Sequence, residues 1–330
     1  MATEDPTSTL AAENISTDVT ETFRLSPLLP RNYLIAHAVF ESIIAVLIVG
    51  GNSIVLISIL IHKNLHTVNN LFLTSLAVAD LIMGIFVSPL TIHILYVKPL
   101  IYVEHTQDKW SCVIRLYLLT MSFGASLFSI CGIALDRYIA IIHPLKYRSL
   151  MTRRRVMVYI LCFWVYVIST CAYLFSEGNI QFKAHETCRT KNVVSPLVFS
   201  VLKIHTFVAI FVSVMSHSVV AMVAAKHRAR INSQLVRFNN NMAVAHRNEN
   251  KIAKTMTLVV GLFLLCWLPS TINSLIKRAD SPDWDKSLSY YLVALMVANS
   301  AVNPWIYGIG MKKMRKAMLN VMQCSMKRSI

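Results

Sequence analysis

The chain has 330 residues, of which 55% are hydrophobic and only 15% charged, and its formal net charge is +16. Soluble globular domains carry about 25% charged residues, so this composition excludes an ordinary soluble protein and indicates one that lies in lipid. A basic excess can also mark nucleic-acid binding. Here the bases flank apolar segments, which favours a membrane surface and excludes a nucleic-acid partner.

Seven mostly apolar runs follow one another along the chain. Each is long enough for a helix that crosses a bilayer, which needs about 20 such residues. The segments between them are too short for a soluble domain. We therefore predict an all-α membrane protein, a bundle of seven transmembrane helices, from runs over residues 34–60, 71–97, 113–142, 156–175, 193–225, 252–276 and 288–309.

The chain divides into an extracellular segment over residues 1–33, a membrane domain over 34–309 and a cytoplasmic tail over 310–330. The first segment lacks the basic start and apolar middle of a cleavable signal peptide, so we expect the first run to serve as an uncleaved signal. Most Lys and Arg residues lie in alternate loops and in the tail, and basic loops stay cytoplasmic. We expect a multi-pass plasma-membrane protein with its N-terminus outside.

Three covalent features fit this orientation. Asn14 begins an Asn-Ile-Ser glycosylation acceptor in the outer segment, with an unused acceptor as the alternative. Cys112 and Cys188 both lie on the oxidising side, and we predict a disulfide between them. In the tail, Met314 and neighbouring apolar residues face away from the bases, which predicts an amphipathic helix on the inner leaflet with an acylated Cys324; an unmodified basic tail is the alternative.

Two acidic side chains lie inside the apolar runs, where an ionisable group is costly unless it is paired or hydrated. Glu41 either faces the bundle and a ligand or reaches outer water. Asp80 lies mid-run, at the depth of Ser126, Asn299 and Asn303, and the two asparagines share one helix face. A carboxylate surrounded by hydroxyl and amide oxygens can hold a small hard cation, so we predict an allosteric sodium ion here and no organic cofactor. The alternative is a protonated Asp80 that is hydrogen-bonded within the bundle.

A charge pair, Asp136 and Arg137, ends the third run. Asp136 can hold the Arg137 guanidinium, and Glu249, at the inner start of the sixth run, is the other acid on that side. We expect Arg137 to join the third and sixth runs in a closed form. Pro269 removes a backbone hydrogen bond from the sixth run, so breaking this bridge would let the run swing and open a groove for a partner helix.

Proline also interrupts the seventh run, where Pro304 follows Asn303 and Tyr307 lies close to the inner end. In the sixth run, Phe263, Trp267, Thr271 and Ser274 follow helical spacing. That spacing suits either a plain packing stripe or an inward-facing set below the Pro269 bend.

A set of motifs in fixed order resembles the rhodopsin-like (class A) family of G-protein-coupled receptors, over nearly all of residues 34–324. No single motif is specific, but the ordered set on seven runs is. It consists of Gly51-Asn52, Leu76-Ala77-Val78-Ala79-Asp80, Cys112, Asp136-Arg137-Tyr138, Trp164, Cys188, Cys266-Trp267-Leu268-Pro269 and Asn303-Pro304-Trp305-Ile306-Tyr307.

The resemblance implies a receptor rather than an enzyme, one that binds an extracellular ligand and activates heterotrimeric G proteins. It further implies arrestin and a receptor kinase as partners. Among the residues, it implies a sodium pocket at Asp80, Ser126, Asn299 and Asn303, a switch aromatic at Trp267, an inner lock of Arg137 with Glu249, and G-protein contacts at Pro144 and Leu145.

The chain departs from the family pattern in its fifth run. That run has no tyrosine between Val193 and Lys226. In the family, such a tyrosine often meets the residue that matches Tyr307 in the active form. We therefore expect this chain to lack that contact and to use His217 or Ser218 in its place.

The ligand is not evident from the motifs. They look nearest to those of amine receptors, but the third-run aspartate that binds an ammonium group there is Leu119 here, and the positions of the opsin lysine and of the adenosine-receptor histidine are both Val297. A neutral or anionic lipophile suits Leu119 and two outer bases, Arg115 and Lys203, which otherwise lie at the lipid interface without a ligand role. We expect a pocket formed by Leu119, Thr120, Phe123, Trp267, Ser270, Thr271, Ser274 and Val293.

Other classes remain as alternatives. One is an amine or nucleoside receptor with an atypical pocket. Another is a secondary transporter that uses Asp80, although internal repeats are not evident. A membrane enzyme would need a constellation of nucleophile and base or of metal ligands, and the histidines are scattered.

Overall fold

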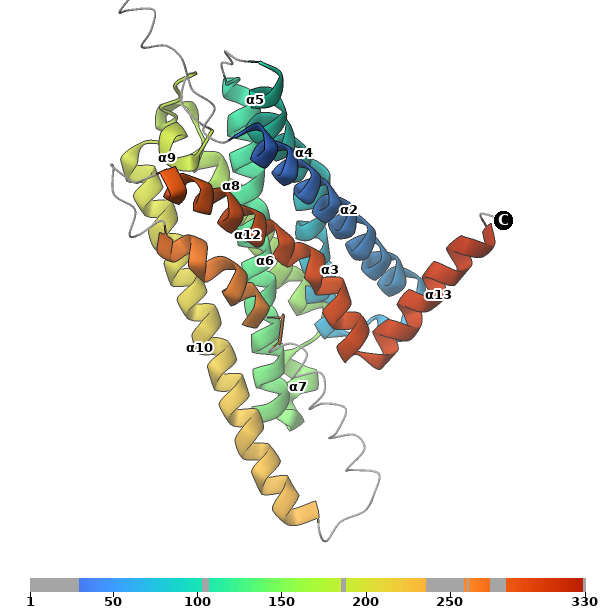
Figure 1. The fold of residues 1–330 in the computed structure, drawn as a ribbon. Helices are drawn as coiled ribbons and strands as arrows, with labels where there is room; N and C mark the ends of the chain where they lie inside the picture. The colour runs from blue at the N-terminus through green and yellow to red at the C-terminus, as the bar shows by residue number, and fades with distance from the viewer. Residues whose placement is uncertain are drawn as a thin grey trace, which may run out of the picture.

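The computed structural model describes residues 30–102, 107–184, 188–235, 258–259, 261–273 and 283–328. Within these residues the fold is helical, with one isolated antiparallel bridge between Ile180 and Val194. Six helices are long and apolar enough to span a membrane, and Gly261–Asn273 is a shorter apolar helix in the expected sixth run. The fold is therefore the predicted all-α bundle (Figure 1).

Most transmembrane segments begin and end within about five residues of the predicted runs, whereas the fifth ends ten residues beyond its predicted end and the sixth is described only in part. The first is α2 (Arg31–Ile61), which η1 (Lys63–Leu65) follows. The second is continuous but irregular, and comprises α3 (Val68–Ile82), η2 (Met83–Val87), α4 (Ser88–Thr91), η3 (Ile92–Val97) and α5 (Lys98–Ile101). The others are α6 (Lys109–Ile142), α8 (Arg153–Leu174), α10 (Pro196–Leu235) and α12 (Asp283–Gly310), with short α7 (Pro144–Leu150), η4 (Glu177–Asn179), α9 (Thr190–Val193) and terminal α13 (Lys312–Arg328).

Polar caps set the first residue of several helices. The Asp108 carboxylate accepts a 2.7 Å hydrogen bond from the Ser111 backbone N–H at the start of α6. Thr67 and Thr152 accept equivalent bonds of 3.4 Å ahead of α3 and α8. Each cap satisfies a backbone N–H that has no acceptor within its own helix. These caps lie outside the apolar runs, which is why the helices begin before the runs do.

Wide π-helical turns interrupt the second transmembrane segment. Pro89 and Pro99 each follow such a turn, in η2 and η3, and proline cannot donate the backbone hydrogen bond that a regular helix requires. The extra residue in each turn changes which side chains face inward. Thr91 and Tyr96, at 2% and 0% exposure, point into the bundle as a result.

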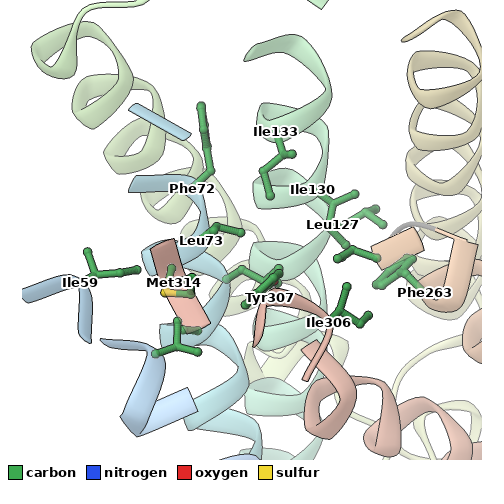
Figure 2. Packing of buried hydrophobic residues seen from close by; sticks show 14 of the residues in the cluster. Ile59, Phe72, Leu73, Leu127, Ile130, Ile133, Phe263, Ile306, Tyr307 and Met314 are labelled. Atoms are coloured by element: carbon green, nitrogen blue, oxygen red, sulfur yellow. The ribbon is translucent and has the colours of Figure 1, made fainter. Parts of the chain in front are cut away.

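The largest apolar core lies in the half of the bundle next to α7 and α13. Figure 2 shows Phe72 and Leu73 of α3, Leu127, Ile130 and Ile133 of α6 and Tyr307 of α12 converging there. Met314 of α13 joins the same cluster and is fully buried, whereas Lys312, Lys313, Arg315 and Lys316 are exposed. The predicted amphipathic helix is therefore present, and its apolar face packs on the end of the bundle.

The outward faces of the long helices are strongly apolar. Val46 and Leu60 of α2 and Leu197 of α10 are 72%, 71% and 75% exposed. A continuous apolar surface of this kind marks contact with lipid in a membrane protein. The inward faces, in contrast, carry the polar side chains from which the candidate site is built.

Candidate functional site

A disulfide fixes the end of the bundle at which α6 begins. Cys112 of α6 and Cys188 are bonded, with their Cα atoms 5.7 Å apart, and both side chains are fully buried. The predicted pairing is confirmed. The bond ties the segment that contains Cys188 to the first turn of α6.

Arg115, one turn along α6 from Cys112, is not an exposed rim base. It is 3% exposed, and its Nη2 donates a 2.6 Å hydrogen bond to the Cys188 carbonyl oxygen. Its Nη1 donates a 3.4 Å bond to Thr91 Oγ1. For Arg115 the structure therefore excludes the alternative at the lipid interface, because the irregular second segment and the disulfide bury its side chain. Lys203 differs: its ammonium lies 4.5 Å from the centroid of the Phe199 ring.

Stacked aromatic rings form the floor of the predicted pocket. The Phe123 and Trp267 rings lie 3.5 Å apart between centroids at 22°, and the Phe263 ring lies 5.7 Å from Trp267 and 5.9 Å from Phe123, so the three rings form a triangle. All three side chains are buried. The Trp267 indole N–H has no acceptor among the described residues. The residues of the predicted pocket floor thus form an aromatic contact between α6 and the helix Gly261–Asn273.

The remaining residues of the predicted pocket that the structure describes are partly buried. Thr120 and Thr271 donate hydrogen bonds of 2.8 and 3.0 Å to carbonyl oxygens four residues earlier in their own helices. Their hydroxyl protons are therefore used, so the pocket is more apolar than its composition indicates. The half-buried members are Leu119, Thr120, Ser270, Thr271 and Val293, and Ser274 lies outside the described residues.

A second polar cluster surrounds Asp80 in the middle of the bundle. Asp80 is 1% exposed, and the other predicted members, Ser126, Asn299 and Asn303, are also buried. Asn303 Nδ2 donates a 2.9 Å bond to Asp80 Oδ2, whereas Oδ1 has no hydrogen bond of normal geometry among the described residues, with the Ser300 side chain near the carboxylate. A carboxylate with one open oxygen beside hydroxyl and amide oxygens is a suitable donor set for a small hard cation.

Two members of this cluster were not in the predicted set. Ser300 lies beside Asp80, and Asn52 of α2 donates a 3.1 Å bond from Nδ2 to the Ser300 carbonyl. The Asn52 side-chain oxygen has no partner within the described part of the chain. Ser300 follows Asn299 directly, so helical spacing alone gave no signal for it.

The charge pair on α6 is held locally. Arg137 Nε donates a 2.9 Å hydrogen bond to Asp136 Oδ2, and the two side chains are 7% and 0% exposed. Tyr147 of α7 donates a 2.7 Å bond to Asp136 Oδ1. Sequence reasoning missed Tyr147, since its link to Asp136 depends on the fold of α7. Glu249, the predicted partner of Arg137, lies outside the described residues.

The structure also describes most of the other residues that were predicted for switching and G-protein coupling. Tyr138 is half-buried, Pro144 begins α7, and Leu145 is 97% exposed on that helix. The helix Gly261–Asn273 continues through Pro269, and α12 continues through Pro304. Tyr307 is 1% exposed.

Close packing surrounds Pro304. A Cβ added at Gly51 would lie 2.9 Å from the Pro304 ring, so glycine at position 51 permits the close approach of α2 and α12. Asn14 and the side chain of Cys324 lie outside the described part of the chain.

Comparison with known proteins agrees with this architecture. Residues 51–307 match the family model of the 7 transmembrane receptor (rhodopsin family). The chain is 30% identical to melanocortin receptor 5 of Mus musculus over 286 residues, which cover 83% of this chain and 80% of the relative. It is 29% identical to adenosine receptor A2b of Gallus gallus over 306 residues, which cover 84% of this chain and 86% of the relative.

Melatonin receptor type 1A of Mus musculus is also similar, with 26% identity over 280 residues that cover 81% of this chain and 74% of the relative. These relatives are receptors and not enzymes. Because the family model spans most of the chain and carries the seven-helix architecture, this protein belongs to the rhodopsin family of seven-transmembrane receptors.

Proposed function

We propose that this receptor binds an extracellular small molecule in the outer half of the bundle and activates heterotrimeric G proteins at the opposite end. The observation that carries this proposal is the connection between those ends along α6. One helix bears the pocket aromatic Phe123, stacked on Trp267, and, further along, Arg137, held by Asp136. A ligand that favours a different Phe123–Trp267 arrangement would shift the population of forms in which Arg137 is released.

The ligand we propose is a lipophile rather than a simple amine. Leu119 stands where a counter-charge for an ammonium group would be needed, and the described hydroxyls of the pocket are partly consumed by their own helices. The named ligands of the relatives do not agree, since their names include melatonin, adenosine and trace amines. An amine or nucleoside receptor with an atypical pocket is the competing assignment.

We propose an allosteric sodium ion at Asp80, with Ser126, Asn299 and Asn303 as further oxygen ligands. The open Asp80 Oδ1 supports this assignment, because a buried carboxylate oxygen without a partner is otherwise costly. When bound, the ion would supply a positive charge that favours the ionised form of Asp80. This chain's own residues would hold the cluster together across the second segment, α6 and α12.

The remaining assignments follow the family. We propose that arrestin and a receptor kinase recognise the activated cytoplasmic face, and that the N-terminus is extracellular. The exposed Leu145 on α7 and the basic face of α13 suit a protein partner and anionic lipid, respectively. Asn14 glycosylation and Cys324 acylation are further proposals.

Guanine-nucleotide exchange on purified G proteins tests this function. Membranes that carry the wild-type chain or its Arg137→Ala variant are compared, with pooled lipids, nucleosides, amines and peptides as ligands. We expect exchange that depends on Arg137 and rises with the lipid pool. G-protein coupling would be contradicted if folded protein at the cell surface gave no exchange with any ligand pool or G protein. The proposed ligand class would be contradicted if simple amines alone raised exchange.

A further inference from the structure

A buried polar cluster near the disulfide has no role in the site described above. It consists of Glu41 of α2, Tyr96 of η3 and Arg115 of α6, which are 1%, 0% and 3% exposed. The three side chains lie within electrostatic reach of one another. Of the two sequence alternatives for Glu41, the structure selects the one in which it faces the bundle.

The polar atoms of this cluster are not satisfied by the described protein. Both carboxylate oxygens of Glu41, the Tyr96 hydroxyl and Arg115 Nε lack a hydrogen-bond partner of normal geometry among the described residues. Arg115 uses its two Nη atoms for the Cys188 carbonyl and Thr91. Buried polar groups in native proteins are nearly always paired. Glu41 and Tyr96 lie close enough to interact with each other through their side chains, so the atoms left for a ligand group are a Glu41 oxygen, which accepts a hydrogen bond, and Arg115 Nε, which donates one.

The cluster lies one helical turn from the apolar ligand pocket. Arg115 and Leu119 are four residues apart on α6 and hence on one face. Leu119 packs on a cluster that contains Met83, Val87 and Val297, and Ile44, one turn below Glu41, packs on the same cluster. A ligand with its apolar body beside Leu119 thus has its head group at Glu41 and Arg115.

Aromatic rings enclose the cluster on its outer side. His37, one turn above Glu41 on α2, stacks on Tyr96 with the centroids 5.7 Å apart and lies 4.6 Å from the Tyr291 ring. Tyr290 also packs on Tyr96, and the Arg189 guanidinium lies 5.2 Å above the Tyr290 ring. These rings exclude water, so a net charge brought into the cluster is not screened by solvent.

We propose that Glu41, Tyr96 and Arg115 form the head-group subsite of the receptor and select a lipophile whose head is neutral overall but has both an N–H donor and an oxygen acceptor, such as a carboxamide. The proposal rests on the ligand pocket of the proposed function and refines its ligand class. The donor meets the Glu41 carboxylate, and the acceptor meets Arg115. A carboxylate head would face Glu41, and an ammonium head would face Arg115, so each charged head meets one like charge.

Three amphiphiles of equal chain length test this selection: dodecanamide, dodecanoate and dodecylamine, each tritiated. Equilibrium binding is measured on the purified full chain and on Glu41→Gln, Arg115→Gln and the double variant. Lys109→Gln is the matched control, because it removes a base at the outer end of α6 whose ammonium pairs with Glu177 outside the cluster. The melting temperature of each variant reports whether it is folded.

We expect the wild-type chain and the Lys109→Gln control to bind the amide at least about tenfold more tightly than either charged compound. Glu41→Gln leaves Arg115 unbalanced, so dodecanoate becomes the preferred ligand. Arg115→Gln leaves the negative charge of Glu41 without its counter-charge, so dodecylamine becomes the preferred ligand. The double variant is neutral again and returns to the amide, which keeps the test decisive if a single variant does not fold.

An unchanged order of the three compounds in the folded variants overturns the proposal, as does the absence of binding of all three to the wild-type chain. In that event Glu41 and Arg115 serve only the packing of the bundle. Failure here does not affect the exchange assay above, because Arg137-dependent exchange with another ligand class would still establish the receptor function.

Discussion

Asn303 and Asp80 are 223 residues apart in the sequence, yet the Asn303 side-chain amide donates a 2.9 Å hydrogen bond to Asp80 Oδ2. The other carboxylate oxygen, Oδ1, has no hydrogen bond of normal geometry among the described residues. This contact joins the second transmembrane segment to α12 beside Pro304. It places a carboxylate in the bundle centre with an unused oxygen, which is the geometry that the sodium proposal requires.

Asp80→Asn is expected to abolish the sodium dependence of receptor stability, because the amide removes the charge that holds the ion. In the wild-type chain, sodium at ten times its dissociation constant should stabilise the protein by about 1.4 kcal/mol. The measurement is the melting temperature in sodium chloride against choline chloride. An equal salt response in both proteins would favour a protonated, hydrogen-bonded Asp80.

Asp136→Asn is expected to raise basal nucleotide exchange about tenfold, since loss of a charge-assisted hydrogen bond of about 1.5 kcal/mol releases Arg137. Tyr147→Phe removes only the hydroxyl that bonds Asp136 and should cause a smaller rise. Exchange is measured at equal surface expression. Glu249→Ala is the informative comparison: unaltered basal exchange in that variant would mean that Asp136 holds Arg137 without Glu249.

Cys112→Ser and Cys188→Ser are each expected to destabilise the receptor by about 2–5 kcal/mol, and the double variant by no more than either single one. The reason is that both substitutions remove the same bond. Thermal unfolding of the purified variants gives the comparison. Additive losses would mean that each cysteine contributes separately to stability.

Gly132→Ala is expected to destabilise the bundle by about 1–3 kcal/mol, because its Cβ would lie 2.3 Å from the Phe72 ring in the core of Figure 2. Gly50→Ala is the matched control, with nothing within 4 Å of the added Cβ, and should be neutral or slightly stabilising. Melting temperatures of the two variants test this. Equal values would contradict the close packing of α3 against α6.

Asp108 gives a pH-dependent contribution to stability. The hydrogen bond from the Ser111 backbone N–H holds the pKa of the Asp108 carboxyl below its usual value. A lowered folded-state pKa stabilises the protein above the unfolded-state pKa, and this stabilisation is lost as pH falls through the folded value. The melting temperature of Asp108→Ala should therefore be lower than that of the wild type at neutral pH.

The difference between these two proteins should shrink below about pH 4, the ordinary range of the aspartate pKa. Asp108→Asn is the control, since its side-chain oxygen also caps a helix but does not titrate. A wild-type advantage over Asp108→Ala that stays constant to low pH would exclude the charged cap.

The sequence by itself determined the membrane class, the seven apolar runs and the amphipathic tail helix, since hydropathy and helical spacing are local properties of the chain. It also predicted Asn303 as a neighbour of Asp80 and the Cys112–Cys188 bond, because position along the apolar runs and the side of the membrane set these residues close together, but it missed Ser300 and Asn52. The tertiary structure decided which polar atoms are left open. Arg115, Glu41 and Tyr96 meet only because two π-helical turns and the Cys112–Cys188 bond bring three helices together. Such contacts depend on helix rotation and relative depth, which the spacing of residues along one helix does not specify.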